Sequence, residues 1–147
     1  MSEREMAMAE HGDDGNAAIL EALSVEDCLR LARSQPVGRV AIAQGDGPPH
    51  VVPVNFVIDD GVVAFRSDTG SKFRLLRGAQ VTFEVDGLDP EGRTGWSVVF
   101  QGPAYEASHW ETDHLQLSPW GPGPKAHWVR IVPTSISGRR IHRMPRQ

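Results

Sequence analysis

The sequence predicts a mainly β protein with short helices, in which six or seven short strands form a closed or partly closed antiparallel barrel. Three observations lead to this fold class. Apolar runs rich in Val, Ile and Phe recur at short intervals, and segments of Gly, Pro and Asp separate them. The run Gln80–Asp86 alternates strictly between polar and apolar residues, which is typical of a half-buried strand. Asp59-Asp60-Gly61 joins two apolar runs, and Asp-Gly in such a place is a strong hairpin signal.

The length and charge of the chain limit its class. Its 147 residues suffice for one domain with a sizeable core, which we expect at 19–143, after a disordered tail at 1–18. The tail is acidic and polar, so it offers little apolar surface to offset the entropy cost of ordering. The net charge of −4 argues against nucleic acid as a partner and makes a local basic segment stand out.

Cysteine usage and hydropathy narrow the class further. Cys28 is the one cysteine of the sequence, so neither a disulfide within the chain nor a zinc site of paired cysteines can form. No apolar run has the length that crosses a bilayer, and the N-terminal segment lacks the apolar centre of a signal peptide. We therefore expect a cytoplasmic protein with no membrane partner.

The first predicted element is a short helix. Ser24 is a good N-cap for a helix that extends to Ala32, and Pro36 ends it. The following segments predict, in order, a strand, a turn and two further strands at Val37–Ala43, Gln44–Pro49, His50–Ile58 and Gly61–Ser67.

The second half of the chain continues this alternation. Ser71–Arg77 is expected to form one or two helical turns, and Gly78 stands in the usual C-cap position. The next strands are expected at Gln80–Asp86 and Trp96–Ala107, the latter with a bulge or a bend at Gly102-Pro103. We expect a polar loop at Gly87–Gly95, a short helix at Ser108–Leu117 and a Pro- and Gly-rich loop at Ser118–Lys125. A strand begins at His127–Pro133, and Ser135–His142 either extends it or forms a last strand.

The segment Arg66–Lys72 is the strongest candidate site. It follows a strand, precedes a short helix and contains Arg66, Ser67, Thr69 and Lys72. Arginine offers a fork of donors, lysine a compact charge, and the hydroxyls and loop amides add hydrogen bonds. This combination favours a phosphorylated ligand, although it matches no glycine-rich phosphate fingerprint and a solvated turn has a similar composition.

Three further segments are candidates, each with an ordinary alternative. Pro53 cannot donate to a strand ladder, so Pro53-Val54-Asn55 indicates an edge or a bulge that either meets a ligand or is satisfied internally. Trp96-Ser97-Val98 suits the wall of a planar ligand, but spacing alone favours core packing. Trp120 stands in a loop, where it either caps a pocket, packs across a dimer or packs within the chain.

No motif identifies a catalytic residue or a metal site. His109 and His114 are five residues apart, which is not the four-residue spacing of a helical zinc pair. The sequence has no Gly-x-Ser-x-Gly elbow, and Cys28 has no evident base near it in the sequence. We therefore assign no catalytic residue and no metal.

In their order along the chain, four segments resemble the pyridoxamine 5′-phosphate oxidase-like family, whose fold is the FMN-binding split β-barrel. They are SVEDCLRLARSQPVGRVAI, PHVVPVNFVIDDGVVAFRSDTGSK, VTFEVDGLDPEGRTGWSVVFQGPA and PWGPGPKAHWVRIVPTSISGRR. The resemblance extends from Ser24 to Ile141 and is greatest with short members of actinobacterial type.

This resemblance implies a homodimer of six-stranded antiparallel split β-barrels with two FMN sites between the subunits. It implies that the FMN phosphate and ribityl chain contact Arg66, Ser67, Thr69 and Lys72. It also implies that the isoalloxazine ring lies near Pro53, Val54, Asn55, Trp96, Ser97 and Val98, with Trp120 contributed by the partner subunit.

The implied function is that of an FMN-dependent oxidoreductase acting on a small organic or quinone-like molecule. A flavin carries the redox chemistry itself, which agrees with the absence of an acid–base pair or nucleophile. No segment matches the substrate-phosphate residues or the C-terminal Arg-x-His element of true pyridoxamine phosphate oxidases, so the reaction stays open. Two alternatives remain. The first is an F420-dependent reductase, in which the acidic tail of the F420 cofactor would contact Arg74, Arg77 and Lys125. The second is a non-catalytic flavin-binding or sensor protein.

Overall fold

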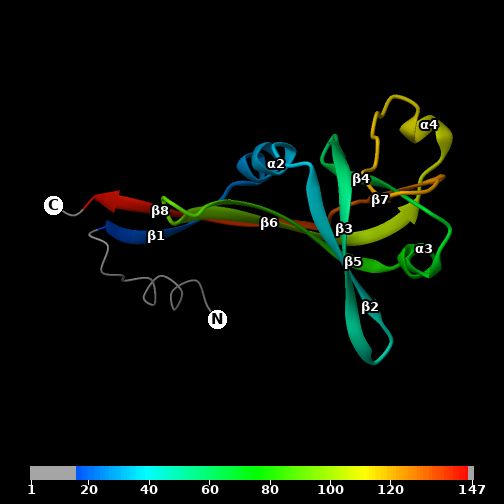
Figure 1. Cartoon of the computed structure of the whole chain (residues 1–147), viewed down its shortest axis with the longest axis horizontal. Helices are drawn as coiled ribbons and strands as arrows, with labels where there is room; N and C mark the ends of the chain where they lie inside the picture. Colours follow the sequence, from blue (N-terminus) through cyan, green and yellow to red (C-terminus); the bar gives the residue numbers. More distant parts are fainter. Residues whose placement is uncertain (1–15, 146–147) are drawn as a thin grey trace.

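The computed structural model of the chain describes residues 16–145, without the side chains of Asn16, Ser71, Lys72, Leu75 and Pro145. Most of the described chain is β-strand, and the helices are short (Figure 1). The elements in chain order are β1 (Asn16–Ala22), α2 (Val25–Arg33), β2 (Val37–Gln44), β3 (Gly47–Asp59), β4 (Val62–Ser67), α3 (Ser71–Leu76), β5 (Gln80–Asp89), β6 (Thr94–Glu106), α4 (His109–Thr112), β7 (His127–Ile131) and β8 (Ser135–Pro145).

Six of these strands close into a barrel in the order β6–β5–β2–β3–β4–β7, and β7 pairs again with β6. Every pairing is antiparallel. Closure depends on β6, whose first part pairs with β8 and whose last residues, Ala104–Glu106, pair with β7. The prediction of a mainly β fold with short helices and a six-stranded antiparallel split barrel is confirmed.

The strand β3 also changes partner along its length, and this opens the barrel on one side. Its residues from Gly47 to Asn55 pair with β2, whereas those from Phe56 to Asp59 pair with β4. The turn from β3 to β4 is the predicted Asp-Gly hairpin, in which Asp60 and Gly61 both have positive φ, at 50° and 80°. That conformation matches the right-handed twist of the two strands.

Alternation along the strands places the core inside the barrel. In β5, Val81, Phe83 and Val85 are buried as the sequence pattern predicts. The ring of Phe83 meets Phe56 edge-on, with centroids 5.1 Å apart, and lies 6.0 Å from that of Phe100. Burial of one such ring stabilises the fold by about 1.5–3 kcal/mol.

The helix α2 covers one face of the sheet beyond the barrel (Figure 1). Ser24 caps it as predicted, since its hydroxyl accepts a hydrogen bond from the Asp27 amide at 3.1 Å. Its own residues Cys28 and Ala32 face the sheet and are fully buried. The amide of Leu23 donates to the Gly138 carbonyl at 2.9 Å, which ties the start of the helix to β8.

Several predicted boundaries differ from the structure. The strand β1 pairs along its whole length with β8 and begins at Asn16, inside the segment expected as a tail; residues 1–15 of that expected tail lie outside the described residues. The hairpin between β5 and β6 extends well into the expected loop at 87–95, and α4 is shorter than the expected helix at 108–117. The described residues contain no helix that is long and apolar enough to cross a membrane.

Candidate functional site

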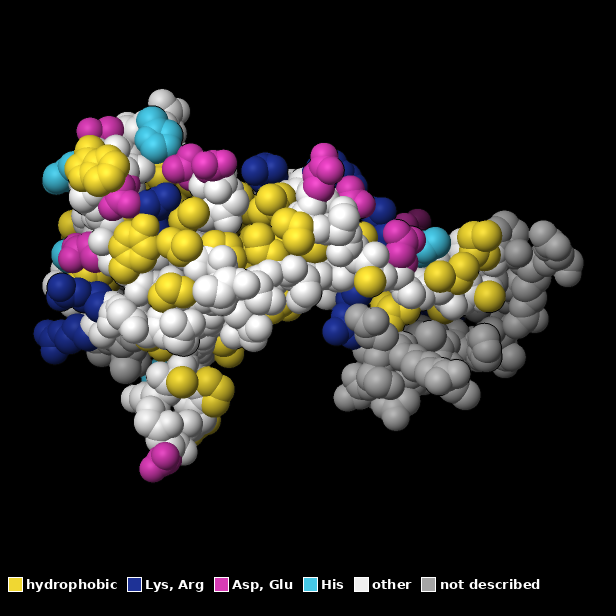
Figure 2. Space-filling view, turned by 180° about the vertical axis from the view of Figure 1, so that it is seen from behind, with side chains coloured by type: hydrophobic (Ala, Val, Ile, Leu, Met, Phe, Trp, Pro, Cys, Tyr) yellow, Lys and Arg dark blue, Asp and Glu magenta, His cyan; other side chains and the backbone are white. Residues whose placement is uncertain are grey.

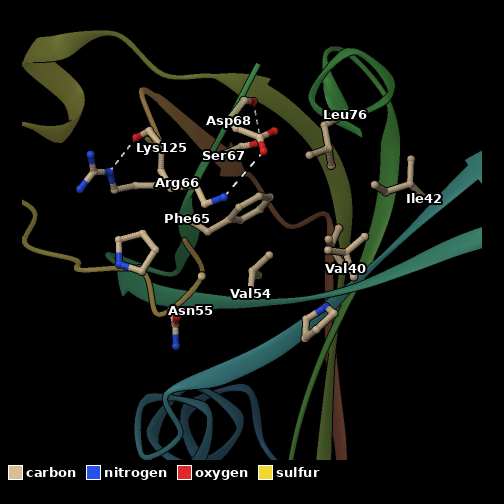
Figure 3. Close-up of a pocket in the computed structure, with 14 residues that line it drawn as sticks. Val40, Ile42, Val54, Asn55, Phe65, Arg66, Ser67, Asp68, Leu76 and Lys125 are labelled. Carbon is tan, nitrogen blue, oxygen red and sulfur yellow. Dashed lines mark hydrogen bonds and ion pairs between the residues drawn. The ribbon is translucent and has the colours of Figure 1, made fainter. Parts of the chain in front are cut away.

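A pocket lies where β3 and β4 separate, and residues 113–126, which we call the strap loop, cross one side of it. Its volume is about 220 Å³. One side is apolar and consists of Val40, Ile42, Val52, Pro53, Val54, Phe65 and Leu76. The other side is polar and consists of Asn55, Arg66, Ser67, Asp68 and Lys125, with Pro119 and Gly121 of the strap loop beside them (Figure 3).

The structure thus brings together five of the residues selected from the sequence. Pro53, Val54 and Asn55 come from the part of β3 that pairs with β2, and Arg66 and Ser67 come from the end of β4. These two segments are not paired with each other, because β3 pairs with β4 only from Phe56 onward. The change of partner in β3 therefore creates the space for a ligand.

Arg66 fastens the strap loop to β4. Its Nε donates to the Lys125 carbonyl at 3.0 Å, and its Nη1 donates to the Leu117 carbonyl at 3.1 Å. The guanidinium also lies over the Trp128 ring, 5.7 Å from the centroid. Two of its five N–H groups are thus committed to the protein, which limits what Arg66 can offer to a ligand.

Asn55 holds the strap loop from the opposite side of the pocket. Its Nδ2 donates to the Pro36 carbonyl at 3.1 Å, and its Oδ1 accepts a hydrogen bond from the Trp120 amide at 2.8 Å. The backbone of Trp120 is therefore fixed at the edge of the pocket, while the residue as a whole is 74% exposed. An indole in this place is available to cover a planar ligand or to meet another chain.

The polar end of the pocket contains one ion pair. Lys125 Nζ points toward Asp68 and lies 3.7 Å from its Oδ2 (Figure 3). The Asp68 side chain turns back on its own loop, where Oδ1 accepts a hydrogen bond from the Gly70 amide at 3.0 Å. Next to it, the Ser67 hydroxyl donates to the Asp68 carbonyl at 3.0 Å.

Thr69 and Lys72 are not among the residues that line this pocket. The Thr69 hydroxyl instead lies 2.9 Å from His127 Nε2, and His127 Nδ1 lies 2.6 Å from a carboxylate oxygen of Glu106. The Phe73 ring stacks on His127 with centroids 4.1 Å apart, so the loop after β4 is attached to β6 and β7. Lys72 lies in α3, and its side chain is outside the described residues.

Trp96, Ser97 and Val98 lie on the part of β6 that pairs with β8, and they are not among the residues that line the pocket. Val98 is fully buried in the core. Trp96 and Ser97 line a separate hollow, together with residues of β1, β5 and β8. Within one chain, the structure therefore does not bring these residues to the others selected from the sequence.

An acidic pair borders this second hollow. Burial of the Glu84 carboxyl, together with Asp86 beside it, raises the pKa of Glu84 to about 7. Arg39 opposes this shift, since its Nη1 lies 2.9 Å from Glu84 Oε1 and 3.4 Å from Asp86 Oδ2. The pair lies on the face of the sheet that α2 leaves uncovered.

Sequence reasoning missed most of the apolar side of the pocket and the position of Lys125. Val40 and Ile42 belong to the alternating pattern of β2, which predicts inward side chains but not a pocket. Lys125 ends the Pro- and Gly-rich loop, where the sequence predicts only a contact with the acidic tail of F420. The other two residues expected to contact that tail are Arg74, which lies in α3, and Arg77, which follows it. Both are exposed.

The described residues contain no cluster of three or more potential metal ligands, and Cys28 is buried. The arrangement in the pocket offers an apolar surface, a cation and hydrogen-bonding groups, which suits an elongated ligand with a planar apolar part and an anionic end.

Comparisons with known proteins agree with this geometry. The family described as pyridoxamine 5′-phosphate oxidase matches residues 24–140. The structure of the FAD binding protein from Mycobacterium smegmatis is 35% identical and has a TM-score of 0.74, with 83% of this chain and 98% of that chain covered. A pyridoxamine 5′-phosphate oxidase-like structure from Corynebacterium glutamicum is 31% identical and has a TM-score of 0.70, with 84% of this chain and 94% of that chain covered. The curated protein Rv0080 of Mycobacterium tuberculosis is 34% identical over an alignment of 128 residues, which covers 81% of this chain and 84% of that protein.

Proposed function

The chain belongs to the pyridoxamine 5′-phosphate oxidase-like family, and on that premise we propose that it is a flavin-dependent oxidoreductase that binds FMN in the pocket between β3 and β4. The single observation that carries the proposal is the two-sided lining of this pocket. Its apolar side suits the ring of a flavin, and its polar end suits a phosphate. FAD shares the ring, the ribityl chain and the first phosphate with FMN, so it fits the same argument.

The residues present fit such a group. Val52 and Val54 provide an apolar surface for a planar ring, and Lys125 provides a positive charge for a phosphate. The bound flavin would supply the electron transfer itself, while the chain binds it, orients it and excludes water from one side. The substrate is a small molecule that reaches the open side of the pocket.

We further propose that the active form is a homodimer in which each subunit completes the site of the other. The pocket volume of about 220 Å³ is below the range of about 300–1,000 Å³ that is typical of complete ligand sites. Trp96 and Ser97, which the family resemblance assigns to the flavin, line a separate hollow on the same chain. Figure 2 shows that the molecule is hollowed beside the projecting β2–β3 hairpin, which leaves room for a second chain.

The test is isothermal titration of the purified protein with FMN, FAD, riboflavin and F420, combined with light scattering to measure its mass. We expect tight binding of FMN or FAD at one site per chain and the mass of a dimer. Preference for F420 would replace the proposal with a deazaflavin-dependent reductase, and binding of none of the four would refute it. Reoxidation of the reduced flavin by a quinone, measured by stopped-flow absorbance, then separates an enzyme from a non-catalytic flavin-binding protein.

A further inference from the structure

We propose that Lys125 receives the flavin phosphate, and that this phosphate replaces the carboxylate of Asp68 as the partner of the lysine. The inference rests on the proposed flavin site and deepens it, since it names a cation that selects phosphorylated over unphosphorylated flavins. Three features of the pocket support it.

The first feature is how the other described cation of the pocket is used. Arg66 directs its Nε and Nη1 to carbonyl groups of the strap loop, at 3.0 and 3.1 Å. These bonds hold the loop, and Figure 3 shows the guanidinium turned toward the Lys125 carbonyl. Arg66 is therefore a positioning residue for the strap loop, and among the described side chains of the pocket the ammonium of Lys125 is the cation directed into it.

The second feature is the loose pairing of a largely buried charge. The Lys125 side chain is only 21% exposed, whereas that of Asp68 is 58% exposed. The Nζ–Oδ2 distance of 3.7 Å is longer than a charge-assisted hydrogen bond of about 2.7–2.9 Å. A partly desolvated ammonium gains from an anion that approaches it closely, and a phosphate offers several oxygens where Asp68 offers one distant oxygen.

The third feature is that the backbone of Lys125 is fixed before any ligand arrives. Its carbonyl accepts the hydrogen bond from Arg66, and β7 begins two residues later at His127. Asn55 fixes the same loop at Trp120. A cation on a loop that is already held in place loses less conformational entropy on binding, so more of the interaction appears as affinity.

Asp68 then has a distinct role as a competitor. Its carboxylate lies in the polar end of the pocket and would repel the phosphate that approaches Lys125. The Gly70 amide, which donates to Asp68 Oδ1 at 3.0 Å, provides the carboxylate with a partner while the phosphate occupies Lys125. Removing the charge of Asp68 is therefore expected to strengthen the binding of a phosphorylated ligand.

The experiment compares the dissociation constants of FMN and riboflavin, which differ only in the phosphate, for the wild type and for Lys125→Gln, Lys125→Arg and Asp68→Asn. Loss of a charged hydrogen bond weakens binding by about tenfold or more. We expect Lys125→Gln to weaken FMN by that factor with riboflavin changed less than twofold, Lys125→Arg to recover most of the affinity, and Asp68→Asn to strengthen FMN alone. Arg74→Gln is the matched control, because it removes an exposed positive charge from neighbouring α3 outside the pocket lining.

The possible failures are distinguishable. If the wild type binds FMN and Lys125→Gln binds it equally well, the assignment of Lys125 is wrong and the flavin site stands. If Lys125→Gln weakens FMN and riboflavin to the same extent, Lys125 shapes the strap loop and does not select the phosphate, which also overturns the inference. If the wild type binds neither flavin, the proposed function fails with it.

Discussion

The most direct test of the pocket architecture is the substitution Asn55→Ala, because one side chain connects three parts of the chain. Its amide donates to the Pro36 carbonyl at 3.1 Å, just before β2, and its oxygen accepts the Trp120 N–H of the strap loop at 2.8 Å. Alanine removes both bonds. At a net value of about 1 kcal/mol for each bond, we expect a loss of about 2 kcal/mol in the free energy of unfolding.

The two bonds can be separated by a matched variant and a local measurement. Asn55→Asp keeps the acceptor oxygen that faces Trp120 and removes the donor that faces Pro36. Hydrogen exchange of the Trp120 amide, followed by NMR, reports the strap-loop bond alone. A loss of about 1 kcal/mol corresponds to an exchange rate about fivefold faster in Asn55→Ala, while Asn55→Asp should remain close to the wild type.

The result also bears on ligand binding, because the same loop contributes Gly121 and Lys125 to the pocket. Asn55→Ala should therefore weaken FMN binding together with the protection of the amide. If Trp120 exchanges within twofold of the wild-type rate in both variants, the loop is not held by Asn55, and the reasoning about the pocket edge is refuted.

Three further predictions concern the scaffold. Gly102→Ala would place a Cβ 2.1 Å from the Val132 carbonyl oxygen, a backbone atom, so we expect a loss of about 1–3 kcal/mol in chemical denaturation. Burial and a neighbouring carboxylate raise the pKa of Glu84 to about 7, above its ordinary value of 4.5, so its contribution to stability is lost as pH rises between those values. Glu84→Gln should therefore gain in melting temperature relative to the wild type between pH 5 and pH 8. Burial also raises the pKa of the Cys28 thiol, so a thiol reagent should modify it at pH 8 only after unfolding in guanidinium.

Each of these predictions has a control or a contrary outcome. Gly121→Ala meets only the end of the Lys125 side chain, at 3.9 Å, and should leave the denaturation midpoint unchanged. A constant difference in melting temperature between Glu84→Gln and the wild type at pH 5 and pH 8 would contradict the raised pKa. Rapid labelling of native Cys28 would show that α2 opens readily from the sheet.

Local patterns predicted much of the scaffold. The alternation of Gln80–Asp86 became β5 with its inward side chains buried, Ser24 became the N-cap of α2, and Asp60-Gly61 became the hairpin turn. Each of these depends on residues a few positions apart, so the sequence contains the relevant interactions. The strand β1 was missed because it pairs with β8, at the other end of the chain, and its own segment has little apolar alternation.

By itself, the sequence determined the barrel strands and the family, whereas anion binding by the Arg66–Lys72 segment stays a prediction. Only the tertiary structure decided which of these residues share a pocket. Arg66 meets Leu117 and Lys125, 51 and 59 positions away, and Asn55 meets Trp120 across 65 positions. The physical reason is that such contacts follow from closure of the barrel and from the partner change in β3, which no local propensity encodes.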